Sequence, residues 1–125
     1  MAETLARLAA RAPIEAPAVL VAAHPDDETI GVGASLSLFR RLLLVHVTDG
    51  APRNGADARA AGFATTTDYS AARRRELEAA LTAGGAVPAL AELHASDQEA
   101  ALTMGELATV LTALMRRHQA AVVIA

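Results

Sequence analysis

Residues 18–33 read AVLVAAHPDDETIGVG, an apolar run that ends in a histidine, a proline and three consecutive acids. A short continuous apolar run is typical of a strand buried on both faces of a parallel sheet. Residues 42–47, LLLVHV, have the same character, and residues 29–40 between them have the length of a helix. The stretch therefore predicts a strand–helix–strand unit whose first strand ends at the acidic residues.

The alternation of strands and helices continues along the chain. We expect the further elements at 3–11 (helix), 69–85 (helix, capped by Asp68 or Ser70), 89–95 (strand), 103–119 (helix) and 120–125 (strand), with a long loop at 50–68. Strands that alternate with helices form right-handed crossovers, so helices cover both faces of a parallel sheet. The sequence predicts an α/β fold in a single domain, residues 1–125.

The composition excludes several classes of function. A net charge of −3 and a pI of about 5.7 provide no basic surface for nucleic acid or for an anionic membrane. No apolar run approaches the ~20 residues of a membrane span, and the N-terminus lacks the apolar core of a signal peptide. We therefore expect a cytoplasmic protein. The chain contains no cysteine, so any metal must be held by histidine and carboxylate groups.

Acid-rich segments follow each of the first three predicted strands. They are HPDDE (24–28), TDG (48–50) and SDQE (96–99). Because the carboxyl ends of parallel strands meet at one edge of the sheet, these segments are expected to lie together, where such sheets form their sites. Asp49 in the second segment is either an acid of this site or a turn former.

The first of these segments has the composition of a metal site. Pro25 favours an extended backbone at His24, and the following turn can bring His24 and Asp27 to one point. An imidazole and a carboxylate suit Zn²⁺ or a similar divalent ion. Asp26 would stand close by, where a base acting on a metal-activated water is needed. The alternative is purely structural, since acids at a helix N-terminus are favourable by ~0.3–1 kcal/mol each.

Three further histidines are weaker candidates. His46 lies inside the second strand and is expected to be a core or edge residue. His118, at the end of the last helix, is expected to be structural because a cation there suits the helix dipole. His94, near the end of the third strand, is the remaining candidate for a third metal ligand.

The motif AAHPDDETIGVGA (22–34) resembles the signature of the PIG-L/LmbE-like N-acetylglucosaminyl deacetylase family. VTDG, RRRELEAAL, DQEA and AAVVIA follow in the family's order, so the resemblance covers about residues 18–125. It implies a Rossmann-like three-layer α/β/α fold and a zinc-dependent hydrolase that removes acetyl from a small N-acetylated sugar conjugate. It implies these roles: metal ligands His24 and Asp27, general base Asp26, substrate contacts Arg73 and Asp97, and support of the metal ligands by Glu28.

The sequence departs from the family pattern at its end. Family members carry a His-x-x-His segment shortly after the fourth strand, and this chain ends at Ala125, where that segment is expected to begin. The resemblance therefore implies that the C-terminal part of the family fold is missing. Two alternatives stay open, a non-catalytic sugar- or metal-binding fragment and a split enzyme completed by a second chain. The open apolar edge of strand 120–125 predicts homo-oligomers or poor solubility.

Overall fold

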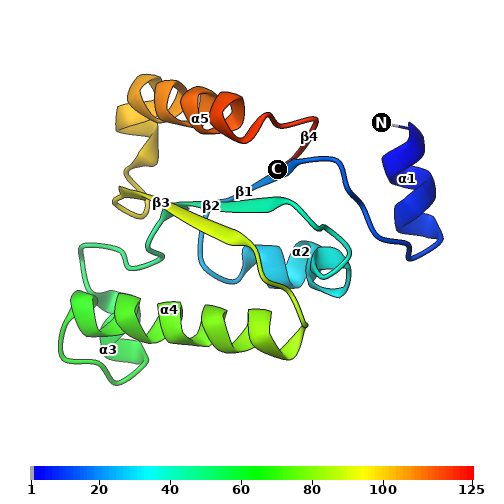
Figure 1. Ribbon diagram of the computed structural model, residues 1–125. Helices are drawn as coiled ribbons and strands as arrows, with labels where there is room; N and C mark the ends of the chain where they lie inside the picture. The colour runs from blue at the N-terminus through cyan, green and yellow to red at the C-terminus, as the bar shows by residue number, and fades with distance from the viewer. Residues whose placement is uncertain (1) are drawn as a thin grey trace.

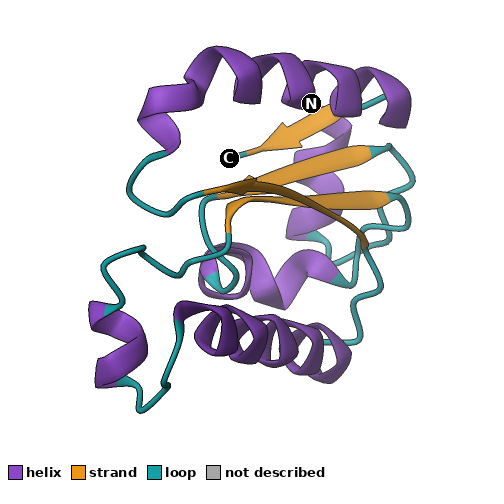
Figure 2. Ribbon diagram, turned by 90° about the vertical axis from the view of Figure 1, so that its left-hand side faces the viewer, coloured by secondary structure: helices purple, strands orange, loops and turns teal. Residues whose placement is uncertain are grey.

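A parallel sheet lies between two layers of helices in the computed structural model, which describes residues 2–125 (Figures 1 and 2). The four strands are β1 (Ala18–Ala22), β2 (Leu42–Thr48), β3 (Ala89–Ala95) and β4 (Val122–Ile124). They are arranged in the order β3–β2–β1–β4, and every pair is parallel. This confirms the predicted α/β class and the Rossmann-like three-layer arrangement.

The helices divide between the two faces of the sheet. Their bounds are α1 Ala2–Ala9, α2 Asp27–Leu36, α3 Ala56–Ala60, α4 Thr66–Ala83 and α5 Met104–His118, with a 3₁₀ turn η1 at Ala100–Thr103. Figure 1 shows α5 alone on one face, α2 and α4 on the other, and α1 beside the sheet. None of these helices, within residues 2–125, combines the length and the apolar character that crossing a bilayer requires.

Alternate residues of the strands build two separate cores. Leu20 of β1 and Leu44 of β2 pack with Leu77 of α4 on one face. On the other face, Val19 packs with Leu114 of α5. Burying one such side chain contributes about 1.5–3 kcal/mol. The small aliphatic residues of the sequence thus permit close contact between helices and sheet.

The predicted boundaries shift where side chains cap the helices. Helix α4 begins at Thr66 rather than residue 69, because Thr65 caps it. The Thr65 hydroxyl accepts from the Asp68 amide at 3.0 Å and donates to the Asp68 carboxylate at 2.7 Å. Asp68 is thus the capping partner in this reciprocal arrangement and not the cap itself. The predicted loop at 50–68 contains the short helix α3 instead of lacking regular structure.

The order in which the chain adds strands to the sheet reverses at β1. From β1 the chain moves to β2 and β3 on one side, and β4 then pairs with β1 on its other side. In open α/β sheets, ligands bind beyond the carboxyl ends of the strands at such a point. The acidic segment after β1 occupies it. Strands β3 and β4 are the edges of the described sheet, and association through the β4 edge stays a prediction.

Candidate active site

The chain makes a tight turn between β1 and α2. The amides of Asp26 and Asp27 both donate to the carbonyl of His24, at 3.0 and 3.3 Å. The Asp27 carboxylate in turn accepts from the amide of His24 at 2.9 Å. Asp26 consequently has φ 156° and ψ −25°, a conformation that costs a residue with a side chain about 1–3 kcal/mol. The turn is therefore held by its own hydrogen bonds in a strained form.

The turn brings together the two residues that the sequence predicts as metal ligands. Nδ1 of His24 lies 3.5 Å from Oδ2 of Asp27, and both side chains are partly exposed. Two ligands of one tetrahedral zinc ion, each ~2.1 Å from it, are about 3.4 Å apart. The chemistry and the separation of this pair fit a divalent ion. Within residues 2–125, no group of three histidine or carboxylate side chains is arranged to hold one.

The second ring nitrogen of His24 contacts the loop that follows β3. Nε2 of His24 lies 2.8 Å from Oδ1 of Asp97, and the amide of Gln98 donates to the same oxygen at 2.8 Å. The predicted edge cluster thus includes residues 73 positions apart in the chain. A substrate contact at Asp97 stays a prediction.

Asp26 is held by an arginine of α4. Nη2 of Arg73 lies 2.8 Å from Oδ2 of Asp26, and the same nitrogen donates to the carbonyl of Pro25 at 3.0 Å. Burial acts to lower the pKa of Arg73, but the Tyr69 hydroxyl and the Asp26 carboxylate outweigh it and raise the pKa above its ordinary value. Arg73 therefore stays a cation and fixes the position of Asp26.

Arg73 reaches this position across a glycine. Gly50, in the turn after β2, has φ +66°. A Cβ atom at Gly50 would lie 3.0 Å from Cζ of Arg73 and 3.3 Å from Cδ of Pro25. The absence of a side chain at residue 50 therefore supplies both the left-handed backbone and the space that the guanidinium occupies.

Glu28 points into the protein and pairs with His46, and both are buried. Oε2 of Glu28 lies 2.8 Å from Nε2 of His46 and accepts from the amide of Asp26 at 3.3 Å. Burial acts to raise the pKa of Glu28, but hydrogen bonds from His46 and Thr29 outweigh it and lower the pKa from 4.5 to about 2. Glu28 thus stays ionised, and the hydrogen bond that it accepts from the Asp26 amide stabilises the strained turn from inside the protein.

Sequence reasoning missed the partnership of Glu28 with His46. The sequence predicts a supporting role for Glu28 and a core or edge position for His46. The structure shows that the two side chains contact each other. Strand alternation contains the signal, because Leu42, Leu44 and His46 share the face of β2 toward which α2 packs.

The other candidates lie apart from His24 and Asp27. His94 is exposed and has Glu92 at 3.9 Å as its ionic neighbour. Nε2 of His118 lies 3.1 Å from the carbonyl of Arg41, which agrees with a structural role. Oδ1 of Asp49 accepts from the amide of Ala51 at 3.0 Å, so this acid shapes the turn after β2, and it also lines a cavity beside Pro25.

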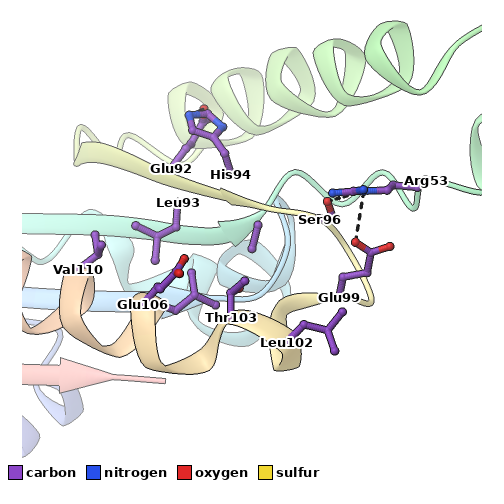
Figure 3. A pocket seen from close by; sticks show the side chains of 12 residues that line it. Arg53, Glu92, Leu93, His94, Ser96, Glu99, Leu102, Thr103, Glu106 and Val110 are labelled. Atoms are coloured by element: carbon purple, nitrogen blue, oxygen red, sulfur yellow. Dashed lines mark hydrogen bonds and ion pairs between the residues drawn. The ribbon is translucent and has the colours of Figure 1, made fainter.

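Two of the cavities near this edge of the sheet lie beside α4 and α5. One of about 250 Å³ extends from Pro25 to α4, and its lining includes the polar side chains of Asp49, Thr67 and Ser70. The other, of about 440 Å³, lies between β3 and α5, and its lining residues are drawn in Figure 3. At the second cavity, Arg53 lies 3.3 Å from Glu99. The first cavity adjoins the turn that carries Asp26.

Comparison with known proteins establishes the family. The family model PIG-L, the GlcNAc-PI de-N-acetylases, matches residues 19–125. The chain therefore belongs to the PIG-L family. The description of the family names a de-N-acetylase, an enzyme of the hydrolase type, and the family is generally metal-dependent.

A solved structure shares the fold. It is that of GalB, the 4-carboxy-2-hydroxymuconate hydratase from Pseudomonas putida KT2440, with a TM-score of 0.64 and 24% sequence identity. The match covers 86% of this chain but 45% of that protein, so the chain spans less than half its length. No curated protein matches the sequence.

Proposed function

We propose that this chain carries the catalytic turn of a zinc-dependent, or other divalent-metal-dependent, N-deacetylase acting on a GlcNAc-type sugar conjugate. The observation that carries the proposal is the turn after β1. There the side chains of His24 and Asp27 stand 3.5 Å apart, and the carboxylate between them in sequence, Asp26, is held by Arg73. Family membership supports the reaction class.

His24 and Asp27 would hold the ion in this proposal. When bound, a divalent ion lowers the pKa of water toward ~7 and polarises a carbonyl group. Asp26 takes one proton from the attacking water as its oxygen adds to the acetamide carbon. When the C–N bond breaks, Asp26 returns this proton to the nitrogen, so the sugar leaves as an amine and acetic acid is formed. The acid then ionises to acetate and its proton goes to the amine or to solvent.

The surroundings of Asp26 suit its proposed role as the general base. Arg73 fixes its carboxylate by a 2.8 Å ion pair, and about half of the side chain stays exposed to solvent and substrate. The adjoining cavity of about 250 Å³ offers the hydroxyls of Thr67 and Ser70 and the carboxylate of Asp49. These groups suit hydrogen bonds with sugar hydroxyls, so the cavity is the proposed binding place of the sugar.

The test combines metal content with release of amine from N-acetylglucosamine conjugates. We expect Asp26→Asn to lower turnover by about 10²–10⁴-fold while sparing the metal, because only the base is lost. His24→Ala is expected to lose the metal as well. Glu99→Gln, a conservative change of a half-buried acid that pairs with Arg53 outside the proposed site, is the matched control and should alter neither. The reverse pattern, with metal lost in Asp26→Asn and kept in His24→Ala, would overturn the assigned roles.

A second candidate is a sugar- or metal-binding module without catalysis of its own. It is favoured by one observation, that residues 2–125 contain no arrangement of three histidine or carboxylate ligands. Zinc well below one ion per chain together with no amine release would support it over the deacetylase. Activity restored by a second chain that supplies histidines would instead identify a split enzyme.

A further inference from the structure

The ring of His24 lies between two carboxylates that come from different parts of the chain. Nδ1 is 3.5 Å from Asp27, its neighbour in the turn, and Nε2 is 2.8 Å from Asp97, which follows β3. The two contacts differ in kind. The shorter distance is that of a hydrogen bond, whereas the longer one lies beyond the usual range of such bonds.

The shorter contact determines where the ring proton sits. An ionised carboxylate accepts hydrogen bonds and cannot donate them, so Nε2 must carry the proton that Asp97 accepts. A neutral imidazole has only one such proton. In the neutral ring, Nδ1 is then left with a free lone pair on the side of the Asp27 carboxylate, which is the state a metal ligand requires.

Asp97 is well placed to impose this state. Its side chain is largely buried, and the Gln98 amide fixes the same Oδ1 atom that contacts His24. Gln98 itself has φ +66°, a left-handed backbone conformation. Both hydrogen bonds described for this carboxylate involve Oδ1, which leaves Oδ2 available for the predicted contact with substrate.

We propose that Asp97 is a positioning residue that fixes the orientation and the tautomer of His24, so that Nδ1 faces the ion held with Asp27. Histidine ligands of metals commonly donate their other ring N–H to a carboxylate, and loss of that partner typically weakens metal binding about 10–100-fold. The inference rests on the proposed function for the identity of the ligand pair. The tautomer itself does not depend on it.

The first experiment locates the ring proton without any metal. Long-range ¹H–¹⁵N correlation spectra of the metal-free 125-residue chain are recorded at about pH 9, where imidazole is ordinarily neutral. We expect His24 to carry its proton on Nε2. Replacing the other three histidines one at a time assigns the signals. A proton on Nδ1 in the unmodified chain would overturn the inference, whatever the variants do.

The second experiment changes Asp97. In Asp97→Asn the side-chain amide can donate to Nε2, which admits the opposite tautomer, as an aspartate-to-asparagine change does in the serine-protease triad. We expect the Nδ1–H form to appear and zinc affinity, measured by competition with a chromophoric chelator, to fall about 10–100-fold. Glu99→Gln, which removes a charge from the same loop away from His24, should alter neither. An unchanged tautomer and unchanged affinity in Asp97→Asn would refute the positioning role.

The two readouts separate the inference from the proposed function. An Nε2–H tautomer that depends on Asp97, in a chain that takes up no zinc, would support the positioning of His24 and contradict the metal-dependent deacetylase. Zinc uptake and amine release from a chain whose His24 carries its proton on Nδ1 would support the deacetylase and contradict the positioning of His24 by Asp97. Unfolding curves of each variant, followed by circular dichroism, verify that the fold is retained.

Discussion

Two histidine–carboxylate pairs lie near the carboxyl ends of β1 and β2, and their contacts have the same length. Nε2 of His46 is 2.8 Å from Glu28, and Nε2 of His24 is 2.8 Å from Asp97. The side chains of the first pair are 1% and 0% exposed, whereas those of the second are 36% and 13% exposed. We call them the buried pair and the rim pair. Only the rim pair has solvent access, so only it can meet a ligand.

The comparison teaches that distance alone does not reveal the role of such a contact. The buried pair stabilises the turn from inside, because Glu28 also accepts from the amide of Asp26. The rim pair presents a ring nitrogen beside a carboxylate at the surface. The four predictions below test this division of roles, from the largest expected effect to the smallest.

Breaking the buried pair should have the largest effect on stability. His46→Ala leaves the Glu28 carboxylate buried without its partner, and we expect the free energy of unfolding to fall by about 3–5 kcal/mol. His24→Ala should lower it by less than about 1 kcal/mol, because solvent replaces the lost contact. Urea unfolding followed by circular dichroism measures both. His46→Gln, which keeps an N–H donor, serves as the control with a smaller loss. Equal losses for the two alanine variants would contradict the distinction.

Acid should reduce the contribution of the buried pair to stability within a defined pH range. The pKa of Glu28 is about 2 in the folded protein against 4.5 ordinarily, so its contribution to stability is fully present above pH 4.5. It declines as the pH falls toward 2, by about 3 kcal/mol in all. Urea unfolding at several pH values across this window measures the loss. Glu28→Gln should remove this part of the pH dependence, and an unchanged acid profile in that variant would count against the assignment.

Gly50 tests how the Asp26 side of the turn is held. Gly50→Ala places a side chain at φ +66° and against Arg73, and the backbone strain alone lowers stability by about 1–2 kcal/mol. Gly62→Ala is a matched control, because Gly62 has φ +83° but nothing within 4 Å of a Cβ. We expect deacetylation to fall in the first variant only, since only there is Arg73 displaced from Asp26. Equal activity in both would show that the contact with Gly50 does not position Arg73.

The smallest effect on folding is expected at the rim pair. Asp97→Asn should change the free energy of unfolding by less than about 1 kcal/mol, because His24 keeps access to water. The shifts of the urea midpoint in this variant and in His46→Ala, each measured against the unmodified protein, compare the contributions of the rim pair and the buried pair to stability. A loss as large as that of His46→Ala would show that Asp97 is a structural residue.

Much of the fold could be predicted because local patterns determine it. The strand at 89–95 has the predicted bounds, and the apolar runs after Pro17 and Arg41 form β1 and β2. The start of α4 could not be placed from helix formers alone, since the reciprocal bonds between Thr65 and Asp68 move it forward. Local hydrogen bonding of this kind competes with propensity at helix ends.

The site could be predicted only as far as one turn extends. The approach of His24 to Asp27 follows from their spacing in the chain, and the meeting of acid-rich segments follows from parallel topology. The partners of His24 and Glu28 do not follow, because they are 73 and 18 residues away in the sequence. Such contacts depend on strand register and on loop conformation, which no short motif specifies.

The conformation of Asp26 has a consequence for how this turn can change. With φ 156° it occupies a conformation that glycine would adopt at lower cost, so the residue proposed as the base is also one whose replacement would relieve strain. Stability and activity therefore impose opposite demands on a single position. A selection for thermal resistance alone would favour glycine at position 26 and yield a sturdier protein without its base, whereas selection for turnover retains the strained aspartate.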